Sequence, residues 1–215
     1  MTTCLYLDTT TQTLLLGLSV NNVLVAEESS ENTSQRYHSA VLLPLIQAMF
    51  QQHGVNPMDL TTVMVVTGPG SFTGLRTGVL VAKTFAQFGG ANLIAVDGLS
   101  LRVWSASQRR CDPASIAVSM KAGRNEVYGA VGSINVDSSV DWQVEPAWFT
   151  NDEWQMVLAA NPHAAMFDDA SPQPTAADLH AWRLAMLQPM FTPWEELTPT
   201  YLQPPRITLK ATPVM

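Results

Sequence analysis

The sequence predicts an α/β fold built around a mixed β-sheet. Three short apolar runs at the N-terminus are separated only by polar turns, which indicates an antiparallel meander. The next apolar runs are joined by helix-like segments, the connection that parallel strands need. A shorter strand–turn–strand arrangement recurs after residue 114, a sign of internal duplication. Together the three observations predict the order βββαβαβα followed by a reduced copy.

The first part of the chain supplies the meander and one helix. Strands are expected over Cys4–Asp8, Thr13–Val20 and Val23–Glu28. A helix is expected over His38–His53, because its apolar residues recur at the helical period and Gly54 supplies a stop signal. The residues that share its apolar face are Leu42, Leu45, Ile46 and Met49.

The densest local signal is Gly68–Gly78, which reads GPGSFTGLRTG between a strand expected over Thr62–Thr67 and a helix expected over Arg76–Phe88. Such glycine density indicates backbone in unusual conformations, or backbone that another group approaches closely. No Gly-Lys-Ser/Thr ends the loop and its glycines are not spaced GxGxxG, so it is neither a P-loop nor a dinucleotide motif. Two interpretations stay open: the loop binds a phosphate at the helix N-terminus, or it packs strand, turn and helix tightly. Gly74 and Gly78 also leave one side of the helix without bulk, so another helix could approach it.

The rest of the chain completes the first part and then repeats it in reduced form. A strand over Leu93–Val96 and a helix to about Ser107 come first, and Gln108–Pro113 is the predicted boundary. The expected later elements are strands over Ser115–Met120, Glu126–Ser133 and Ala164–Phe167, a helix over Trp154–Ala160 with capping-box spacing at Thr150 and Glu153, and a helix from Thr175 to about Gln188. No element is assigned to residues 134–149. The predicted division is 1–107 for the first lobe, 108–195 for the second and 196–215 for a C-terminal tail.

The composition favours a protein that contacts other proteins. The 215 residues are 47% hydrophobic and only 13% charged, against roughly 25% charged in average domains, so surplus apolar surface is expected at an interface. A net charge of −7 makes the chain a poor ligand for nucleic acid by itself. No apolar run approaches the ~20 residues of a membrane span, and Met1–Leu7 has no basic segment typical of a secretory signal. Cys4 and Cys111 form no metal-ligand pattern and fit a reducing cytosol.

Few residues qualify as catalytic candidates. Asp8 closes the first strand and is followed by Thr9 and Thr10. In actin-like kinases an acidic residue at such a turn faces phosphates and their metal ion; in the alternative interpretation Asp8 hydrogen-bonds its own turn. The four histidines form no HxxxH or HExxH pair, and the spacing supports no Ser-His-Asp or Cys-His triad. The sequence therefore predicts no metal site, no cofactor and no catalytic residue.

Several segments of this chain resemble the TsaB (YeaZ) family, the accessory proteins of tRNA threonylcarbamoyladenosine synthesis. The segments that carry the resemblance are Leu7–Thr10, Gln35–Ser39 with Leu43-Pro44, Gly68–Gly78, and more weakly Glu126–Tyr128 and Pro199–Leu202. The match is dense over residues 1 to about 107 and thin afterwards. The family usually has Asp-Ala-Arg where this chain has Lys121–Arg124, and an arginine where it has Gln203, which puts polar contacts of the second lobe in doubt.

The resemblance implies an actin-like (ASKHA, ribonuclease H-like) fold of two lobes with mixed sheets, the second lobe reduced. It implies a cytoplasmic, non-catalytic scaffold that binds a TsaD-like paralogue, which threonylcarbamoylates adenosine 37 of tRNA. A TsaE-like ATPase completes the complex, a homodimer is the alternative assembly, and tRNA is met only through the partner. The rival function is a small actin-like ATP-dependent phosphotransferase. A peptidase is the second rival, and the sequence offers it no nucleophile or metal set.

The resemblance also implies where the sites lie. Partner contacts are expected on the first two helices and the glycine loop, at His38, Leu42, Leu45, Met49, Gly70, Ser71, Gly74, Arg76 and Gly78. Asp8, Thr9 and Thr10 would mark a vestigial nucleotide site.

Overall fold

The computed structural model describes residues 1–31, 37–109 and 115–203. In chain order the elements are β1 (Thr3–Asp8), β2 (Thr13–Val20), β3 (Val23–Glu31), α1 (Tyr37–Gln52), the 3₁₀ turn η1 (Pro57–Asp59), β4 (Thr62–Gly68), α2 (Phe72–Gly89), β5 (Asn92–Asp97), α3 (Gly98–Gln108), β6 (Ile116–Gly123), β7 (Glu126–Ile134), β8 (Val140–Thr150), α4 (Asn151–Ala160), β9 (Ala165–Phe167) and α5 (Ala176–Ala185). They build two sheets, in the strand orders β3-β2-β1-β4-β5 and β8-β7-β6-β9.

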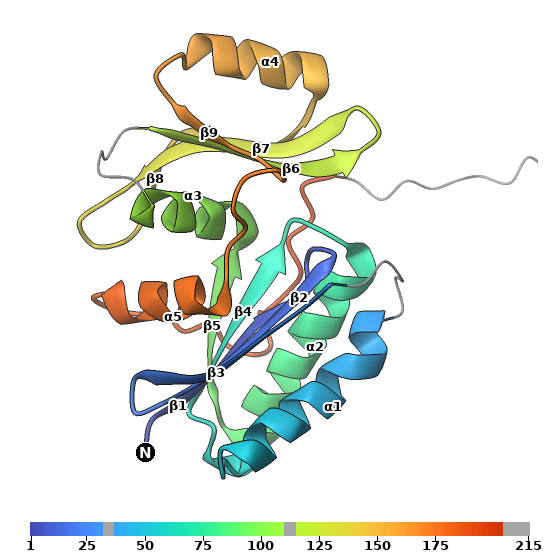
Figure 1. The fold of residues 1–215 in the computed structure, drawn as a ribbon, viewed down its shortest axis with the longest axis vertical. Coiled ribbons are helices and arrows are strands. Elements are labelled where there is room, and N and C mark those ends of the chain that lie inside the picture. Colours follow the sequence, from blue (N-terminus) through green and yellow to red (C-terminus); the bar gives the residue numbers. More distant parts are fainter. Residues whose placement is uncertain (32–36, 110–114, 204–215) are drawn as a thin grey trace, which may run out of the picture.

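The first sheet is mixed, as predicted. β1, β2 and β3 pair antiparallel, whereas β4 and β5 run parallel to β1 through helical connections. Figure 1 shows α1 and α2 side by side on one face of this sheet, and α5 lies on the opposite face. Since β1 and β4 are covered on both faces, every residue in them is buried.

Alternate residues of the central strands face two separate cores. In β1, Leu5 and Leu7 pack with the residues of α1 and α2, whereas Cys4 and Tyr6 pack with α3 and α5. This alternation is the two-residue period of a strand. It explains the continuous apolar runs of these strands, which have no solvent-facing side.

The second sheet repeats the chain path of the first. A meander of β6, β7 and β8 is followed by α4 and by β9, which pairs parallel with β6. In the first lobe the same order is β1, β2, β3, α1 and β4. The predicted internal duplication is thereby confirmed, and the described residues of the second sheet include no strand in the place of β5. α3 lies between the sheets and α4 covers the outer face (Figure 1).

Two sequence predictions in this half were wrong. Residues 140–150, left without an element, form β8, and α5 ends at Ala185 instead of Gln188. β8 is an edge strand with half-buried residues, so it tolerates Pro146 and the charges of Asp141 and Glu145, which obscure a strand in the sequence.

The chain crosses back to the first lobe after β9. α5, expected within the second lobe, packs on β1, β2 and β3. Thr192 N then donates to Leu93 O at 2.9 Å and Thr200 N to Thr67 O at 2.7 Å, and Leu197 enters the core beneath α2. The division at residue 108 stays a prediction, and much of the expected boundary (110–114) and tail (204–215) lies outside the described residues.

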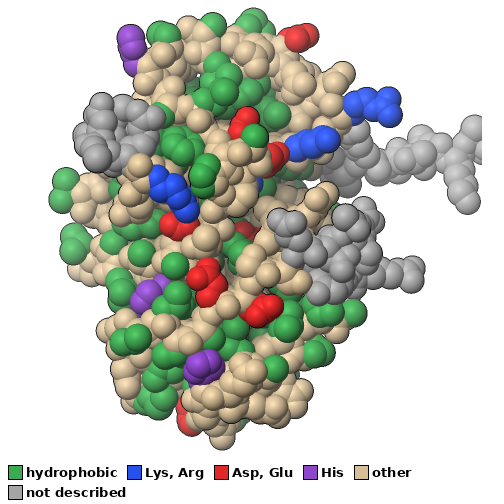
Figure 2. Space-filling model, viewed as in Figure 1, with side chains coloured by type: hydrophobic (Ala, Val, Ile, Leu, Met, Phe, Trp, Pro, Cys, Tyr) green, Lys and Arg blue, Asp and Glu red, His purple; other side chains and the backbone are tan. Residues whose placement is uncertain are grey.

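The surface carries few charges. Figure 2 shows apolar side chains spread over one face of the molecule, with charged side chains sparse among them. Among the helices of the described part of the chain, none combines the length and the apolar character needed to cross a bilayer.

Candidate partner-binding site

The turn after β1 lies directly against the N-terminus of α2. Ser71 N donates to Thr10 O at 2.7 Å, and Thr9 Oγ1 donates to Gly74 O at 2.7 Å. Ser71 also caps α2, since its Oγ accepts from Gly74 N at 3.4 Å. Strand, turn and helix therefore meet backbone to backbone at this corner.

The glycines of the loop make this approach sterically feasible. A Cβ added at Gly74 would fall inside the van der Waals contact distance of the Thr9 carbonyl oxygen, and one at Gly70 inside that of the Thr10 carbonyl oxygen. A Cβ at Gly78 would collide with the Thr9 hydroxyl. The group that approaches the glycines is thus the protein's own turn. This geometry matches the tight-packing interpretation of the loop.

The carboxylate of Asp8 accepts hydrogen bonds from the same turn. Its Oδ1 accepts from Thr10 N at 2.8 Å and from Thr10 Oγ1 at 2.7 Å, and the side chain is buried. The interpretation in which Asp8 hydrogen-bonds its own turn is therefore confirmed. The structure brings together all three residues of the expected vestigial nucleotide site, and Thr9 and Thr10 both bond within the corner.

A buried arginine lies at the junction of the lobes. Arg102 of α3 pairs with Asp169 at 3.2 Å, and the second carboxylate oxygen of Asp169 accepts from Lys121 N at 2.8 Å. Burial lowers the pKa of Arg102, while the charges of Asp169, Asp8 and Asp168 act in the opposite direction. Over the described ranges, no group of three or more His, Cys, Asp or Glu side chains could hold a metal ion.

The face predicted on α1 divides into an inner and an outer part. Leu42 and Met49 are buried in the core and Leu45 is partly buried against it, so all three fix α1 on the sheet. His38 lies in the first turn of α1. Leu43, which the sequence analysis did not assign to the interface, is 57% exposed. A partner would meet Leu43 and its exposed neighbours on this helix.

α2 carries exposed apolar residues that the sequence analysis did not identify. Phe72, Leu80 and Phe88 are exposed along this helix together with the expected contact Arg76, whereas Leu75, Val79 and Ala82 are buried. A second apolar series outside the buried stripe was the signal that could have found them. We call Leu43, Phe72, Arg76, Leu80 and Phe88 the α1–α2 face.

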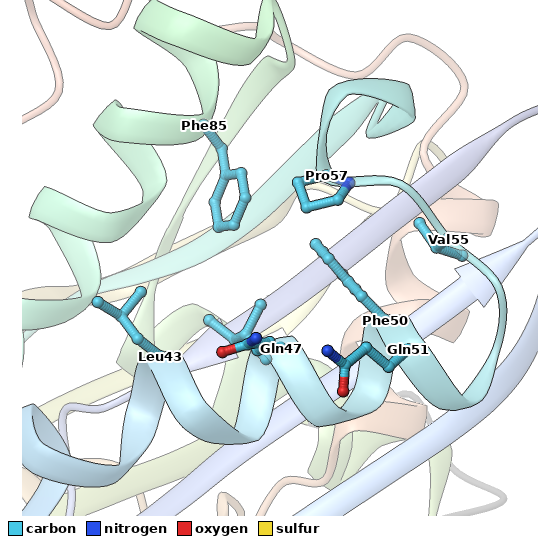
Figure 3. Close-up of a pocket in the computed structure, with 8 residues that line it drawn as sticks. Leu43, Gln47, Phe50, Gln51, Val55, Pro57 and Phe85 are labelled. Atoms are coloured by element: carbon cyan, nitrogen blue, oxygen red, sulfur yellow. The ribbon is translucent and has the colours of Figure 1, made fainter.

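A groove opens between the two helices at the C-terminal end of α2. Its volume is about 370 Å³, and Figure 3 shows side chains of α1, α2 and the connection after α1 converging on it. The lining residues are Leu43, Ile46, Gln47, Phe50, Gln51, Val55, Pro57 and Phe85. Apolar carbon dominates the lining, so the groove suits an apolar side chain.

The altered second-lobe motif forms its own small cluster. Gln203 Nε2 donates to Glu126 Oε2 at 3.4 Å, and a Cβ at Gly123 would collide with the same carboxylate. Glycine at 123 therefore leaves room for the Glu126 side chain, and Gln203 bonds to it from the C-terminal segment.

Comparison with known proteins places the chain in a family. The family model "TsaD: tRNA N6-adenosine threonylcarbamoyltransferase" matches residues 24–154. The tRNA threonylcarbamoyladenosine biosynthesis protein TsaB of Bacillus subtilis is 32% identical over 126 residues, covering 59% of this chain and 53% of that protein. TsaB of Haemophilus influenzae is 28% identical, covering 59% and 52%. The chain thus matches about half the length of these curated relatives.

The structural comparison covers more of the chain. YeaZ from Pseudomonas aeruginosa superposes with a TM-score of 0.74 at 21% identity, covering 94% of this chain and 100% of that chain. This likeness and the two mixed sheets confirm the predicted actin-like (ASKHA) fold. The chain therefore belongs to the family that the model describes, and within it to the TsaB (YeaZ) proteins.

Proposed function

We propose that this chain is a non-catalytic accessory protein of tRNA threonylcarbamoyladenosine synthesis. It binds a TsaD-like threonylcarbamoyltransferase through the α1–α2 face and supports modification of adenosine 37, meeting tRNA only through that enzyme. A TsaE-like ATPase joins the same complex, and the assembly works in the cytoplasm. The names of the relatives support the pathway.

The exposed α1–α2 face is the observation that carries the scaffold role. Leu80 is 66% exposed and Phe88 71% exposed on α2, and Leu43 is 57% exposed on α1, which packs beside it. Large apolar side chains exposed on neighbouring helices are typical of protein–protein contacts. The corner at Asp8 supports the same proposal, because its turn and its glycines bond and pack with each other.

The test combines association with activity. The chain is co-purified with the threonylcarbamoyltransferase of its own organism, and tRNA modification is assayed with and without it. Leu80→Asp is expected to weaken association about tenfold or more, because it places a charge in the apolar face. Met156→Asp, an equally exposed change on α4 (64% against 66%), is the matched control and is expected to bind like wild type. Wild-type protein that neither binds the enzyme nor supports modification would refute the proposal.

The phosphotransferase rival is separated by Asp8→Asn. The amide keeps an oxygen that can accept from Thr10 N, so the fold should survive the change. A scaffold with this substitution supports tRNA modification at the wild-type level. If the isolated chain binds ATP and Asp8→Asn abolishes both binding and modification, the scaffold proposal is wrong.

A further inference from the structure

We propose that Arg76 is a preorganised carboxylate anchor, and that the α1–α2 face is built for a non-identical partner that contributes an Asp or Glu side chain. The inference rests on the proposed function and specifies its partner: an apolar protein surface that carries an acidic residue opposite Arg76.

The geometry of Arg76 leaves its terminal nitrogens available. Its Nε donates to Tyr201 Oη at 3.2 Å, and its guanidinium lies 3.8 Å from the centre of the Phe72 ring. The two rings lie next to each other, with centroids 5.3 Å apart. The aromatic pair thus holds the guanidinium, and no described residue bonds to Nη1 or Nη2. These two groups form the fork that pairs end-on with a carboxylate.

The charge of the two helices favours an acidic occupant. In a chain with a net charge of −7, neither α1 nor α2 contains an Asp or Glu residue. Arg76 and Lys83 are the only Lys or Arg residues of the two helices. Lys83 Nζ donates to Leu197 O at 3.2 Å, beside Trp194. Arg76 is therefore the cation of this face whose terminal nitrogens have no hydrogen-bond partner among the described residues.

A second copy of the chain complements this face poorly. If two α1–α2 faces met, each Arg76 would be desolvated against helices that supply no carboxylate. A buried cation without a counter-ion strongly weakens an interface, because its lost hydration is not replaced. The nearest acidic residues along the C-terminal segment, Glu195 and Glu196, follow Trp194 at the Lys83 end of α2, two helical turns from Arg76.

Nucleic acid is also a poor occupant. Affinity for a phosphate backbone grows with the number of cations that contact it, and this face offers one guanidinium among Leu43, Phe72 and Leu80. Arginine flanked by aromatic rings is instead typical of the residues that dominate protein interfaces.

The test measures the affinity of the full chain for the threonylcarbamoyltransferase by titration calorimetry. Arg76→Lys keeps the charge but loses the fork, and is expected to weaken binding about tenfold; Arg76→Glu is expected to weaken it about a hundredfold or more. Arg124→Glu makes the same change in net charge on the exposed hairpin of the second lobe and should stay within about twofold of wild type. Arg76 is exposed, so melting temperatures should agree among all four proteins.

The outcomes separate this inference from the proposed function. Wild-type protein that does not bind the enzyme would refute both. Wild-type protein that binds, with Arg76→Glu and Arg124→Glu equally weakened or unaffected, would refute the carboxylate anchor alone. Sedimentation of the isolated chain measures its self-association. A wild-type homodimer tighter than the complex with the enzyme would refute the inference that this face binds a non-identical partner. If the isolated wild-type chain binds tRNA directly and Arg76→Glu abolishes that binding, then Arg76 binds a phosphate and the proposed carboxylate contact is wrong.

Discussion

The two lobes share one chain path but close their corresponding corners by different forces. In the first lobe the turn after β1 and the loop after β4 meet through backbone, with Ser71 N on Thr10 O at 2.7 Å. In the second lobe the matching strands are β6 and β9. Asp169, which follows β9, accepts from Lys121 N near the end of β6 and pairs with Arg102 of α3. One corner relies on steric fit and the other on charge.

The difference teaches where each lobe tolerates change. A backbone contact against glycine has no room for one extra carbon, so the first corner is expected to be intolerant of any side chain. A half-exposed carboxylate can exchange its partner for water, so the second corner is expected to lose less stability than the first and to depend on salt. Comparing substitutions at the two corners tests this contrast.

The largest effect is expected at the first corner. Gly74→Ala should lower the free energy of unfolding by about 3 kcal/mol or more, because the methyl group meets the Thr9 carbonyl and backbone must move. Gly89→Ala, in the last turn of the same helix, has no neighbour closer than 3.7 Å and should be neutral or stabilising. Urea denaturation of both variants makes the comparison. Equal stability of the two would show that the corner relaxes freely.

The return of the C-terminal segment to the first lobe should have the next largest effect. Leu197 is 2% exposed in the core beneath α2, so Leu197→Ala is expected to cost about 2–4 kcal/mol. Leu187→Ala changes a leucine that is 76% exposed just after α5 and should cost less than about 0.5 kcal/mol. Denaturation midpoints of both variants give the comparison. If Leu197→Ala leaves the denaturation midpoint unchanged, the core of the first lobe does not need this segment for its stability.

These corners also show what the sequence could and could not predict. The central strands β1, β2 and β4 were located within a few residues because they are buried on both faces and bounded by polar turns. The helix periods identified Leu42 and Met49, but periodicity reports the buried side of a helix and says little about the outward Leu80. The contact between Gly74 and Thr9 joins residues 65 positions apart. Glycine density predicted that something approaches the loop, and only the fold shows that it is Thr9.

The charged corner should respond asymmetrically. Arg102 has an 8% exposed side chain and Asp169 a 52% exposed one. Asp169→Asn leaves the buried Arg102 guanidinium without its counter-ion, although the amide oxygen can still accept from Lys121 N. The free energy of unfolding is expected to fall by about 2 kcal/mol. Arg102→Met keeps the aliphatic packing and lets water solvate the remaining Asp169 carboxylate. The free energy of unfolding is therefore expected to fall by about 1 kcal/mol. Denaturation of both variants and of the double variant gives the coupling. The reverse order would mean that Asp8 and Asp168 already neutralise Arg102.

The smallest effect concerns α5, which ties the second half of the chain to the first sheet through a polar cluster. Arg183 Nε donates to Tyr6 Oη at 2.8 Å, so the phenol proton is free to bond His180 Nδ1, also at 2.8 Å. This arrangement needs a neutral imidazole, and burial followed by the charge of Arg183 lowers the pKa of His180 below its usual value of 6.5.

The sign of the pH dependence follows from this direction. A histidine with a lowered folded pKa binds its proton more readily when unfolded, so it contributes stability above pH 6.5 that is lost as the pH falls through the folded pKa. His180→Gln should therefore flatten the decline in the free energy of unfolding between pH 7.5 and 5, whereas His163→Gln, at an exposed loop, should retain the wild-type slope. An unchanged slope in His180→Gln would mean that groups other than His180 cause the loss of stability in acid.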